Sequence, residues 1–217
     1  MGRSIIVLGC PRTGTSLVAA MLHHMGVDMG EGHLQPPDVN NPLGYYEDLR
    51  WQALNKRLVG LQYEHCWPDT VDDDALQQYR ELAAECDRQE IWGMKDPRLC
   101  FTLHIIAPLL ADPRLVVVRR RSQEGVVASL VRHSERSYHG QYRMDAEQAA
   151  LLYAEWRIGL ERQVAMFGGP KLEAVYEDVI DAPRYWDALL GRFAFKRLQI
   201  GPRPGAYHLV RSEMRHG

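Results

Sequence analysis

Residues Gly9–Ser16, with the sequence GCPRTGTS, have the composition of a loop that binds a phosphate-like anion. Their two glycines and final serine fit the pattern GxxxxGK(S/T), in which backbone N–H groups and a helix N-terminus converge on the anion. Thr15 stands where that pattern has lysine, and the only cation in the loop is Arg12. We therefore expect a loop that holds a phosphate-like group but is poorly equipped for ordinary ATP or GTP chemistry.

A second group of charged side chains, Lys95, Asp96 and Arg98, follows the apolar run Ile91–Met94. Lys95 supplies the point charge that the loop lacks, so we favour a role for it at the reacting group. For Asp96 we favour a cap on a helix that begins near Leu99, since the following proline disfavours helical backbone at residue 96. Asp96 and Arg98 are also candidate substrate-binding residues because they share this strand end.

Three arginines, Arg119, Arg120 and Arg121, follow the apolar run Leu115–Val118, and Ser129 comes eight residues after the last of them. In a parallel sheet this places positive charge at the carboxyl edge, where guanidinium groups match phosphate oxygens. Ser129 would lie about two helical turns further on and face the same anion. We favour a second phosphate site here over the alternative, a solvated basic turn.

The elements that must position these groups are predicted by four short β-like runs, Ile5–Leu8, Ile91–Met94, Leu115–Val118 and Leu172–Tyr176. Between them lie helical patterns, of which Leu76–Cys86 and Ala146–Phe167 are the clearest. The alternation predicts an α/β fold, with a mostly parallel central sheet flanked by helices in a P-loop NTPase-like three-layer architecture. We find no linker, and expect one domain over residues 1–217, with a core at about 5–193 and a tail at about 200–217.

The segment Glu31–Asp48 is the least regular part of the chain, because paired prolines, paired asparagines and two glycines interrupt it. It follows the helix after the loop, so its ends can return to the strand edge where open α/β sheets bind ligands. Tyr45 and Tyr46 within it are candidate substrate-binding residues. The segment Ser134–Met144 is a second candidate wall of an acceptor pocket. Its aromatic, Arg and His residues suit a carbohydrate or another polar hydroxyl compound as well as a phenol.

The composition limits the possible partners. A net charge of −2 over 217 residues gives no global attraction to nucleic acid or to an anionic membrane, so any anion site must be local. No apolar run approaches the length of a membrane span. The four cysteines are widely spaced and show no metal-binding pattern, and we expect Cys10 to be an exposed thiol rather than part of a disulfide. A cytoplasmic protein without a bound metal is the expectation.

Five segments in this order, PRTGTS, GYYED, KDPRLC, VVVRRRSQEGVVASL and VYEDV, make the chain resemble the PAPS-dependent sulfotransferases, where PAPS is 3′-phosphoadenosine 5′-phosphosulfate. The resemblance is strongest to short bacterial and phage-like members with a KDPR element, and runs from about Ile5 to about Phe193. It implies transfer of a sulfuryl group from PAPS to a hydroxyl or amine of an acceptor, with release of adenosine 3′,5′-bisphosphate (PAP). It implies no metal.

The resemblance also implies roles for individual residues. The 5′-phosphosulfate would be bound by the loop residues Pro11, Arg12, Thr13, Gly14, Thr15 and Ser16. Arg121 and Ser129 would bind the 3′-phosphate, since the family's Arg and Ser are also eight residues apart, while the arginine triplet leaves Arg120 as a neighbouring alternative. Residues Tyr176–Asp178 resemble the family's YED, which we expect to be mainly structural. The family's GxxGxWK element has only a faint counterpart at Gly201–Tyr207.

Sulfuryl transfer to a hydroxyl benefits from a general base. Pro97 stands where cytosolic eukaryotic members have a histidine, and other branches of the family use a glutamate after the P-loop helix. Glu31 has the better chain distance for that role, whereas Glu47 lies among aromatic residues that can desolvate it; we favour Glu47. Lys95 and Arg12 would stabilise charge at the transferred group, which makes four catalytic candidates in all.

Two other functions compete with this interpretation. A P-loop kinase or nucleotide hydrolase would use Asp96 to bind Mg²⁺, but Thr15 in the lysine position argues against it. A non-catalytic nucleotide-binding protein of the same fold would have lost its chemistry, yet the candidate base, cation and both phosphate sites are all present. The sequence leaves open whether the acceptor is a small molecule or a carbohydrate, and it leaves the oligomeric state unknown.

Overall fold

The computed structural model describes residues 2–59, 68, 71–136 and 143–195. The strands are β1 (Arg3–Leu8), β2 (Ile91–Lys95), β3 (Arg114–Arg119) and β4 (Lys171–Val175). The helices are α1 (Thr15–His24), α2 (Leu49–Val59), α3 (Asp73–Cys86), α4 (Leu99–Ile106), the short 3₁₀ helix η1 (Ala107–Leu109), α5 (Gln123–Arg136), α6 (Ala146–Met166), α7 (Tyr176–Asp181) and α8 (Pro183–Ala194). The expected tail with Gly201–Tyr207, and residues 137–142 of the candidate acceptor wall, lie outside the described residues. No described helix is long and apolar enough to cross a membrane.

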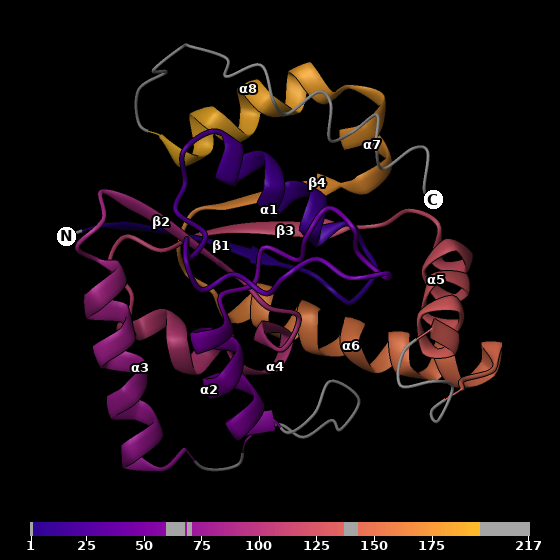
Figure 1. Ribbon diagram of the computed structural model, residues 1–217, viewed down its shortest axis with the longest axis horizontal. Coiled ribbons are helices and arrows are strands. Elements are labelled where there is room, and N and C mark those ends of the chain that lie inside the picture. The colour runs from indigo at the N-terminus through magenta and orange to yellow at the C-terminus, as the bar shows by residue number, and fades with distance from the viewer. Residues whose placement is uncertain (1, 60–67, 69–70, 137–142, 196–217) are drawn as a thin grey trace.

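The four strands form one parallel sheet in the order β2-β1-β3-β4 (Figure 1). Ile6 of β1 pairs with Met94 on one side and with Leu115 on the other, so the strand that leads into the phosphate-type loop is central. All four predicted strands are confirmed. Three of them, β1, β2 and β3, are mostly buried and read as continuous apolar runs, whereas the edge strand β4 is largely open to solvent. The strand order reverses between β1 and β3, which is where ligands bind in such sheets.

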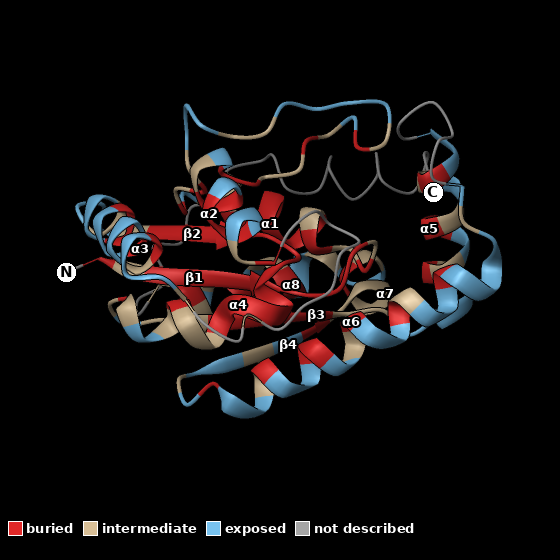
Figure 2. Ribbon diagram, turned by 90° about the horizontal axis from the view of Figure 1, so that it is seen from below, coloured by how far each residue is buried: buried red, intermediate tan, exposed pale blue. Residues whose placement is uncertain are grey.

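Alternating side chains of the strands build an apolar core on each face of the sheet. Ile5 and Val7 face α1, α7 and α8, whereas Ile6 and Leu8 face α2, α3, α4 and α6 (Figure 1). Figure 2 shows the central strands buried between helices whose outer sides are exposed. The predicted three-layer α/β architecture is therefore confirmed, and the loops at the carboxyl ends of the strands are the surface left for a site.

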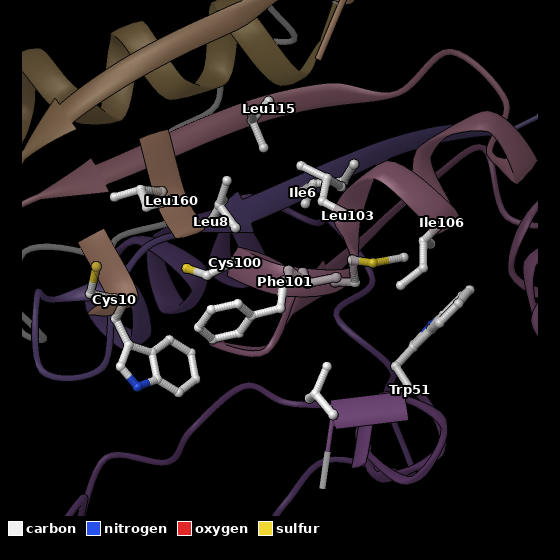
Figure 3. Close-up of a cluster of buried hydrophobic side chains, with 14 of the residues drawn as sticks. Ile6, Leu8, Cys10, Trp51, Cys100, Phe101, Leu103, Ile106, Leu115 and Leu160 are labelled. Atoms are coloured by element: carbon white, nitrogen blue, oxygen red, sulfur yellow. The ribbon is translucent and has the colours of Figure 1, made fainter. Parts of the chain in front are cut away.

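The prediction that Cys10 is an exposed thiol is wrong. Cys10 is 1% exposed and belongs to the core cluster that also contains Cys100 of α4 (Figure 3). The reason is the period of the strand: residue 10 continues the alternation of Ile6 and Leu8, which directs its side chain to the same buried face. Cys10, Cys86 and Cys100 are free thiols.

Candidate active site

The loop between β1 and α1 curls into the helix N-terminus through two residues in the left-handed region, Arg12 at φ +67° and Gly14 at φ +95°. A Cβ at Gly14 would lie 2.3 Å from Cδ2 of Tyr176, so glycine is the residue that fits. The hydroxyl of Thr13 donates to the carbonyl oxygen of Cys10 at 2.7 Å and closes the turn. This is the local geometry of a phosphate-binding loop.

A cavity of about 1220 Å³ opens at this loop, on the carboxyl edge of the sheet. Its lining contains seven basic side chains and two acidic ones: Arg12, Lys56, Lys95, Arg98, Arg120, Arg132 and Arg136, with Asp38 and Glu47. A chain with a net charge of −2 thus concentrates positive charge in one hollow. This hollow is therefore the candidate for the expected local anion site.

Glu47 and Lys95 form an ion pair inside the cavity. Lys95 ends β2, Glu47 comes near the end of the irregular segment 31–48, and Nζ lies 2.5 Å from Oε1. The side chain of Lys95 is 4% exposed and that of Glu47 is 6% exposed, so water screens the pair poorly. Lys95 Nζ also donates to Oγ of Ser16 at 3.3 Å. The structure therefore brings the favoured base, the favoured cation and the last residue of the loop together.

Two amide side chains that the sequence analysis missed hold this group in place. Gln52 Nε2 donates to Oε2 of Glu47 at 2.9 Å, and Asn41 Nδ2 donates to Oγ of Ser16 at 3.1 Å. Gln52 occupies a buried position of α2, and a polar residue at such a position is a weak signal that could have identified it. Asn41 lies in the irregular segment, where the sequence offers no such signal.

Glu31, the other candidate base, lies apart from this group. It is exposed, and its backbone N–H donates to Oδ1 of Asp28 at 2.9 Å. It lines a separate small hollow of about 160 Å³ with Asp28 and Arg50. Of the two glutamates, only Glu47 is among the described residues that line the large cavity.

The two tyrosines expected to bind substrate have separate environments. Tyr45 lines the cavity, donates to Oδ1 of Asp38 at 2.8 Å, and places its ring 5.9 Å from Lys95 Nζ. Burial, together with the hydrogen bond to Asp38, raises the pKa of Tyr45. Tyr46 instead packs against His23, with ring centroids 5.5 Å apart, beside the core under α1. Its backbone, at φ +56°, turns the side chain away from its neighbour's, so the expectation for Tyr46 is corrected.

The expectation that Asp96 caps α4 is wrong in position: Arg98 is the N-cap residue and has no side-chain cap among the described residues, and Asp96 closes the turn just before it. Its Oδ1 accepts from the backbone N–H and from Nη1 of Arg98, both at 2.9 Å, and its Oδ2 accepts from Asn55 at 3.0 Å. Burial raises the pKa of Asp96, and the Arg98 guanidinium opposes that rise. Arg98 lines the cavity but Asp96 does not, which corrects the expectation that both would contact substrate.

The three consecutive arginines, of which Arg119 is the last residue of β3, contact different parts of the molecule. Arg121 pairs with Asp178 at 2.7 Å and its side chain is 62% exposed, while Arg119 pairs with glutamates of α6 and β4. Arg120 alone of the three lines the cavity. Residue 121 lies in a bend beyond the end of β3, where strand alternation no longer sets the side-chain direction, and its guanidinium turns to Asp178 of α7 and not to Ser129. Glu177 accepts from the backbone N–H groups of Arg121 and Ser122, the structural role expected for the YED segment.

Ser129 contacts Arg12 in place of Arg121. Its buried hydroxyl accepts from Arg12 Nε at 2.9 Å. Arg120 joins the same group, with Nη1 at 3.3 Å from the carbonyl oxygen of Arg12 and the guanidinium 4.8 Å above the Tyr176 ring. A second cationic group therefore lies on the β3 side of the loop, built from Arg12 and Arg120.

His133, one turn after Ser129 on α5, lines the cavity beside these cations. Burial and the charge of Arg12 lower the pKa of His133 to about 4, against a smaller opposing effect of Asp38. Its imidazole is therefore neutral near pH 7 and adds no charge to the cavity.

The structure is that of an α/β protein with a P-loop-like fold and a cationic cavity at the carboxyl edge of its sheet. Comparison with protein families narrows that class, because the model of the Sulfotransferase family matches residues 4–186. The chain belongs to this family. A search of curated proteins found no match.

Solved structures with a similar fold are bacterial sulfotransferases or a sulfotransferase domain. STF1 from Mycobacterium tuberculosis superposes with a TM-score of 0.54 at 17% identity, over 98% of this chain and 72% of its own. The sulfotransferase domain from the curacin biosynthetic pathway superposes with a TM-score of 0.54 at 17% identity, over 93% of this chain and 76% of its own. STF9 from Mycobacterium avium superposes with a TM-score of 0.53 at 14% identity, over 99% of this chain and 68% of its own. At sequence identities of 14–17%, these superpositions show that the chain shares the fold of these proteins.

Proposed function

We propose that this protein transfers a sulfuryl group from PAPS to a hydroxyl acceptor and releases PAP. The observation that carries the proposal is the buried Glu47–Lys95 pair, which contacts Ser16 of the phosphate-type loop inside a cationic cavity. The carboxylate of Glu47 can accept a proton, and the ammonium of Lys95 can stabilise an anionic oxygen. The carboxylate contacts the ammonium, and the ammonium contacts Ser16 of the loop proposed to hold the donor. Membership of the Sulfotransferase family supports the reaction class.

In the proposed reaction, the carboxylate of Glu47 takes the proton of the acceptor hydroxyl as the hydroxyl oxygen attacks sulfur. The new O–S bond forms while the bond from sulfur to the bridging phosphate oxygen breaks, and the electron pair leaves with PAP. Lys95 and Arg12 stabilise negative charge on the transferred group and on the leaving oxygen. Each such preorganised donor contributes on the order of 3 kcal/mol to catalysis in comparable sites.

The charge distribution of PAPS fits the two cationic groups of the cavity. The loop residues Pro11–Ser16 would hold the 5′-phosphosulfate, which needs less positive charge than the β- and γ-phosphates of ATP. The 3′-phosphate would lie against Arg12, Arg120 and Ser129; we therefore move the role first expected for Arg121 to Arg120. Tyr45 and Arg98 remain proposed acceptor-side residues because they line the same cavity.

The kinase alternative finds less support in this geometry. It would use Asp96 to bind Mg²⁺, but both oxygens of Asp96 accept hydrogen bonds, from Arg98 and from Asn55. Within the described part of the chain, no group of three or more His, Cys, Asp or Glu side chains is placed to hold a metal ion.

Transfer of label from ³⁵S-PAPS to a panel of phenols, alcohols and sugars tests the proposal directly. Thermal unfolding with PAP, and separately with ATP and Mg²⁺, tests the donor. We expect PAP to stabilise the protein, by about 2.7 kcal/mol at a concentration of 100 Kd. Stabilisation by ATP with Mg²⁺ but not by PAP would contradict the proposal and favour the kinase. Binding of PAP without transfer to any acceptor would favour the non-catalytic alternative.

A further inference from the structure

A third cationic group lies on the β2 side of the cavity and takes no part in the donor contacts proposed above. It consists of Lys56 on α2 and Arg98 at the start of α4, two helices that cover the same face of the sheet (Figure 1). The strand order β2-β1-β3-β4 places the loop Pro11–Ser16, which follows β1, between Arg98, which follows β2, and Arg120, which follows β3. We call Lys56 and Arg98 the β2-side cations.

Arg98 is a buried cation with an unused donor. Its side chain is 6% exposed, and Nη1 donates to Asp96 at 2.9 Å. Its Nε is buried and has no hydrogen-bond partner among the described residues. A buried charged donor without a partner carries a desolvation penalty, which an anionic ligand in the cavity would relieve.

Lys56 has no carboxylate partner among the residues that the structure describes. Its Nζ donates to the neutral amide oxygen of Gln52 at 2.7 Å, and it forms no ion pair within the described part of the chain. Burial, together with repulsion from Arg98, lowers the pKa of Lys56, and this outweighs the attraction of Asp96 and Glu47. Two like charges that repel one another at a cavity wall form a place where a bound anion is favourable.

The β2-side cations are connected to the proposed base through one residue. Gln52 accepts from Lys56 through its amide oxygen and donates to Glu47 through its amide nitrogen. An acceptor held by Lys56 would therefore have its anionic group about one side chain away from the carboxylate that takes its proton. This spacing separates the group that binds from the hydroxyl that reacts.

The geometry points to an acceptor that carries an anionic group, such as a carboxylate or a sulfate or phosphate ester, bound by Lys56 and Arg98 while its hydroxyl faces Glu47. This inference rests on the proposed function and specifies its substrate class. It assigns to the β2-side cations a contact with the acceptor, distinct from the contacts of the donor.

The test uses the full chain saturated with PAP, so that the cations proposed to hold the two phosphates of the donor are occupied. Thermal unfolding is followed as glucuronate is added, with its uncharged counterpart glucuronamide as the matched probe and inorganic sulfate as a minimal anion, all at constant ionic strength. We expect glucuronate and sulfate to stabilise the PAP-bound protein and glucuronamide to have a much smaller effect. Equal effects of glucuronate and glucuronamide, together with no effect of sulfate, would overturn the inference.

Substitutions of Lys56 test whether the β2-side cations cause the stabilisation by glucuronate and sulfate. Lys56→Gln should weaken glucuronate and sulfate binding about 10-fold, the usual size of one charge-assisted contact, and Lys56→Arg should restore it. Arg57→Gln is the matched control, because Arg57 is the next residue on α2, pairs with Asp72 and Asp74, and lies off the cavity. Unchanged anion binding in Lys56→Gln, or the same loss in Arg57→Gln, would contradict the assignment.

The design separates two failures. If PAP itself does not stabilise the protein, the proposed function is wrong and the anion titration has no donor complex to report on. If PAP binds and the acceptor-side anion does not, the proposed function stands and the anionic acceptor is ruled out. Once a labelled acceptor is known, the kcat/KM ratio between an acid and its amide should fall about 10-fold in Lys56→Gln.

Discussion

At the scale of the residue, the central feature is a carboxylate whose two oxygens have different partners. Oε1 of Glu47 contacts the ammonium of Lys95, and Oε2 accepts from the amide of Gln52. Both contacts fix the direction of the carboxylate, which a proton acceptor in a cavity requires. Because the pair is buried, loss of one partner would leave the other charge uncompensated.

Glu47→Gln should lower kcat for sulfuryl transfer by about 10²- to 10⁴-fold, because glutamine keeps the shape of glutamate but cannot take a proton. PAP affinity, measured by isothermal titration calorimetry, should change little. Glu31→Gln is the control and should retain activity within about twofold, since Glu31 is exposed and lies off the cavity. Loss of activity in Glu31→Gln with retention in Glu47→Gln would reverse the assignment of the base.

The arginine triplet gives a second test at this scale. Arg120→Gln should weaken PAP binding about 10-fold or more, since it removes the guanidinium that lines the cavity beside Arg12. Arg121→Gln should alter the dissociation constant by no more than about twofold, because Arg121 is exposed and paired with Asp178. Calorimetric titration of PAP into both variants measures the two dissociation constants. A larger loss of PAP affinity in Arg121→Gln would restore the expectation that Arg121 binds the 3′-phosphate.

At the scale of the element, the turn between β1 and α1 depends on a contact with the start of α7. Gly14 and Gly26 both have φ near +100°, at +95° and +104°, so alanine is strained at either position. Only at Gly14 does a Cβ meet another residue, the ring of Tyr176 at 2.3 Å; nothing lies within 4 Å at Gly26.

Gly14→Ala should therefore lower the free energy of unfolding by about 2 kcal/mol more than Gly26→Ala, because a steric collision adds to the backbone strain. Urea denaturation of the two variants measures the difference. Equal losses would show that the Tyr176 ring moves aside without penalty.

The helix α5 supplies a pH-dependent test through His133. Its pKa is about 4 in the folded protein and about 6.5 when unfolded, so between these values the unfolded chain binds the proton more tightly. The stability that this neutral imidazole contributes is complete above pH 6.5 and is lost as the pH falls towards 4, by roughly 2 kcal/mol after allowance for its partial exposure.

The pH dependence of the unfolding free energy should accordingly be shallower in His133→Gln than in the unchanged protein between pH 6.5 and 4. Titration of the His133 ring followed by NMR gives the pKa independently. A midpoint near 6.5 in the folded protein would refute the assigned environment.

The strands could be predicted and α2 could not, for a physical reason. Buried parallel strands such as Leu115–Val118 consist of apolar residues on both faces, so the sequence displays them directly. In α2 the buried face includes Gln52 and Asn55, which bond to Glu47 and Asp96 and obscure the apolar stripe. The irregular segment 31–48 has no period, and its contacts with the site, through Asn41, Tyr45 and Glu47, depend on the tertiary fold.

At the scale of the whole molecule, the sequence predicted where charges gather but not which of them face the cavity. The three strand ends that carry Arg12, Lys95 and the arginine triplet meet at one edge because the sheet is parallel, and that much follows from order along the chain. The choice between Arg120 and Arg121, or between Glu31 and Glu47, depends on the directions of single side chains. Those directions are set by backbone geometry at the ends of strands and within loops, where no residue pattern records them.

The hydroxyl of Ser16 accepts from both Asn41 and Lys95, and this has a consequence for the order in which substrates associate. A donor bound at the loop would compete for these two groups, so its arrival would alter the contacts of the segment that carries Glu47. The acceptor should then bind productively only after PAPS, in a compulsory-order sequence. Equilibrium dialysis should accordingly find the acceptor bound to the PAP-loaded protein and not to the free protein; equal binding to both would instead indicate random association.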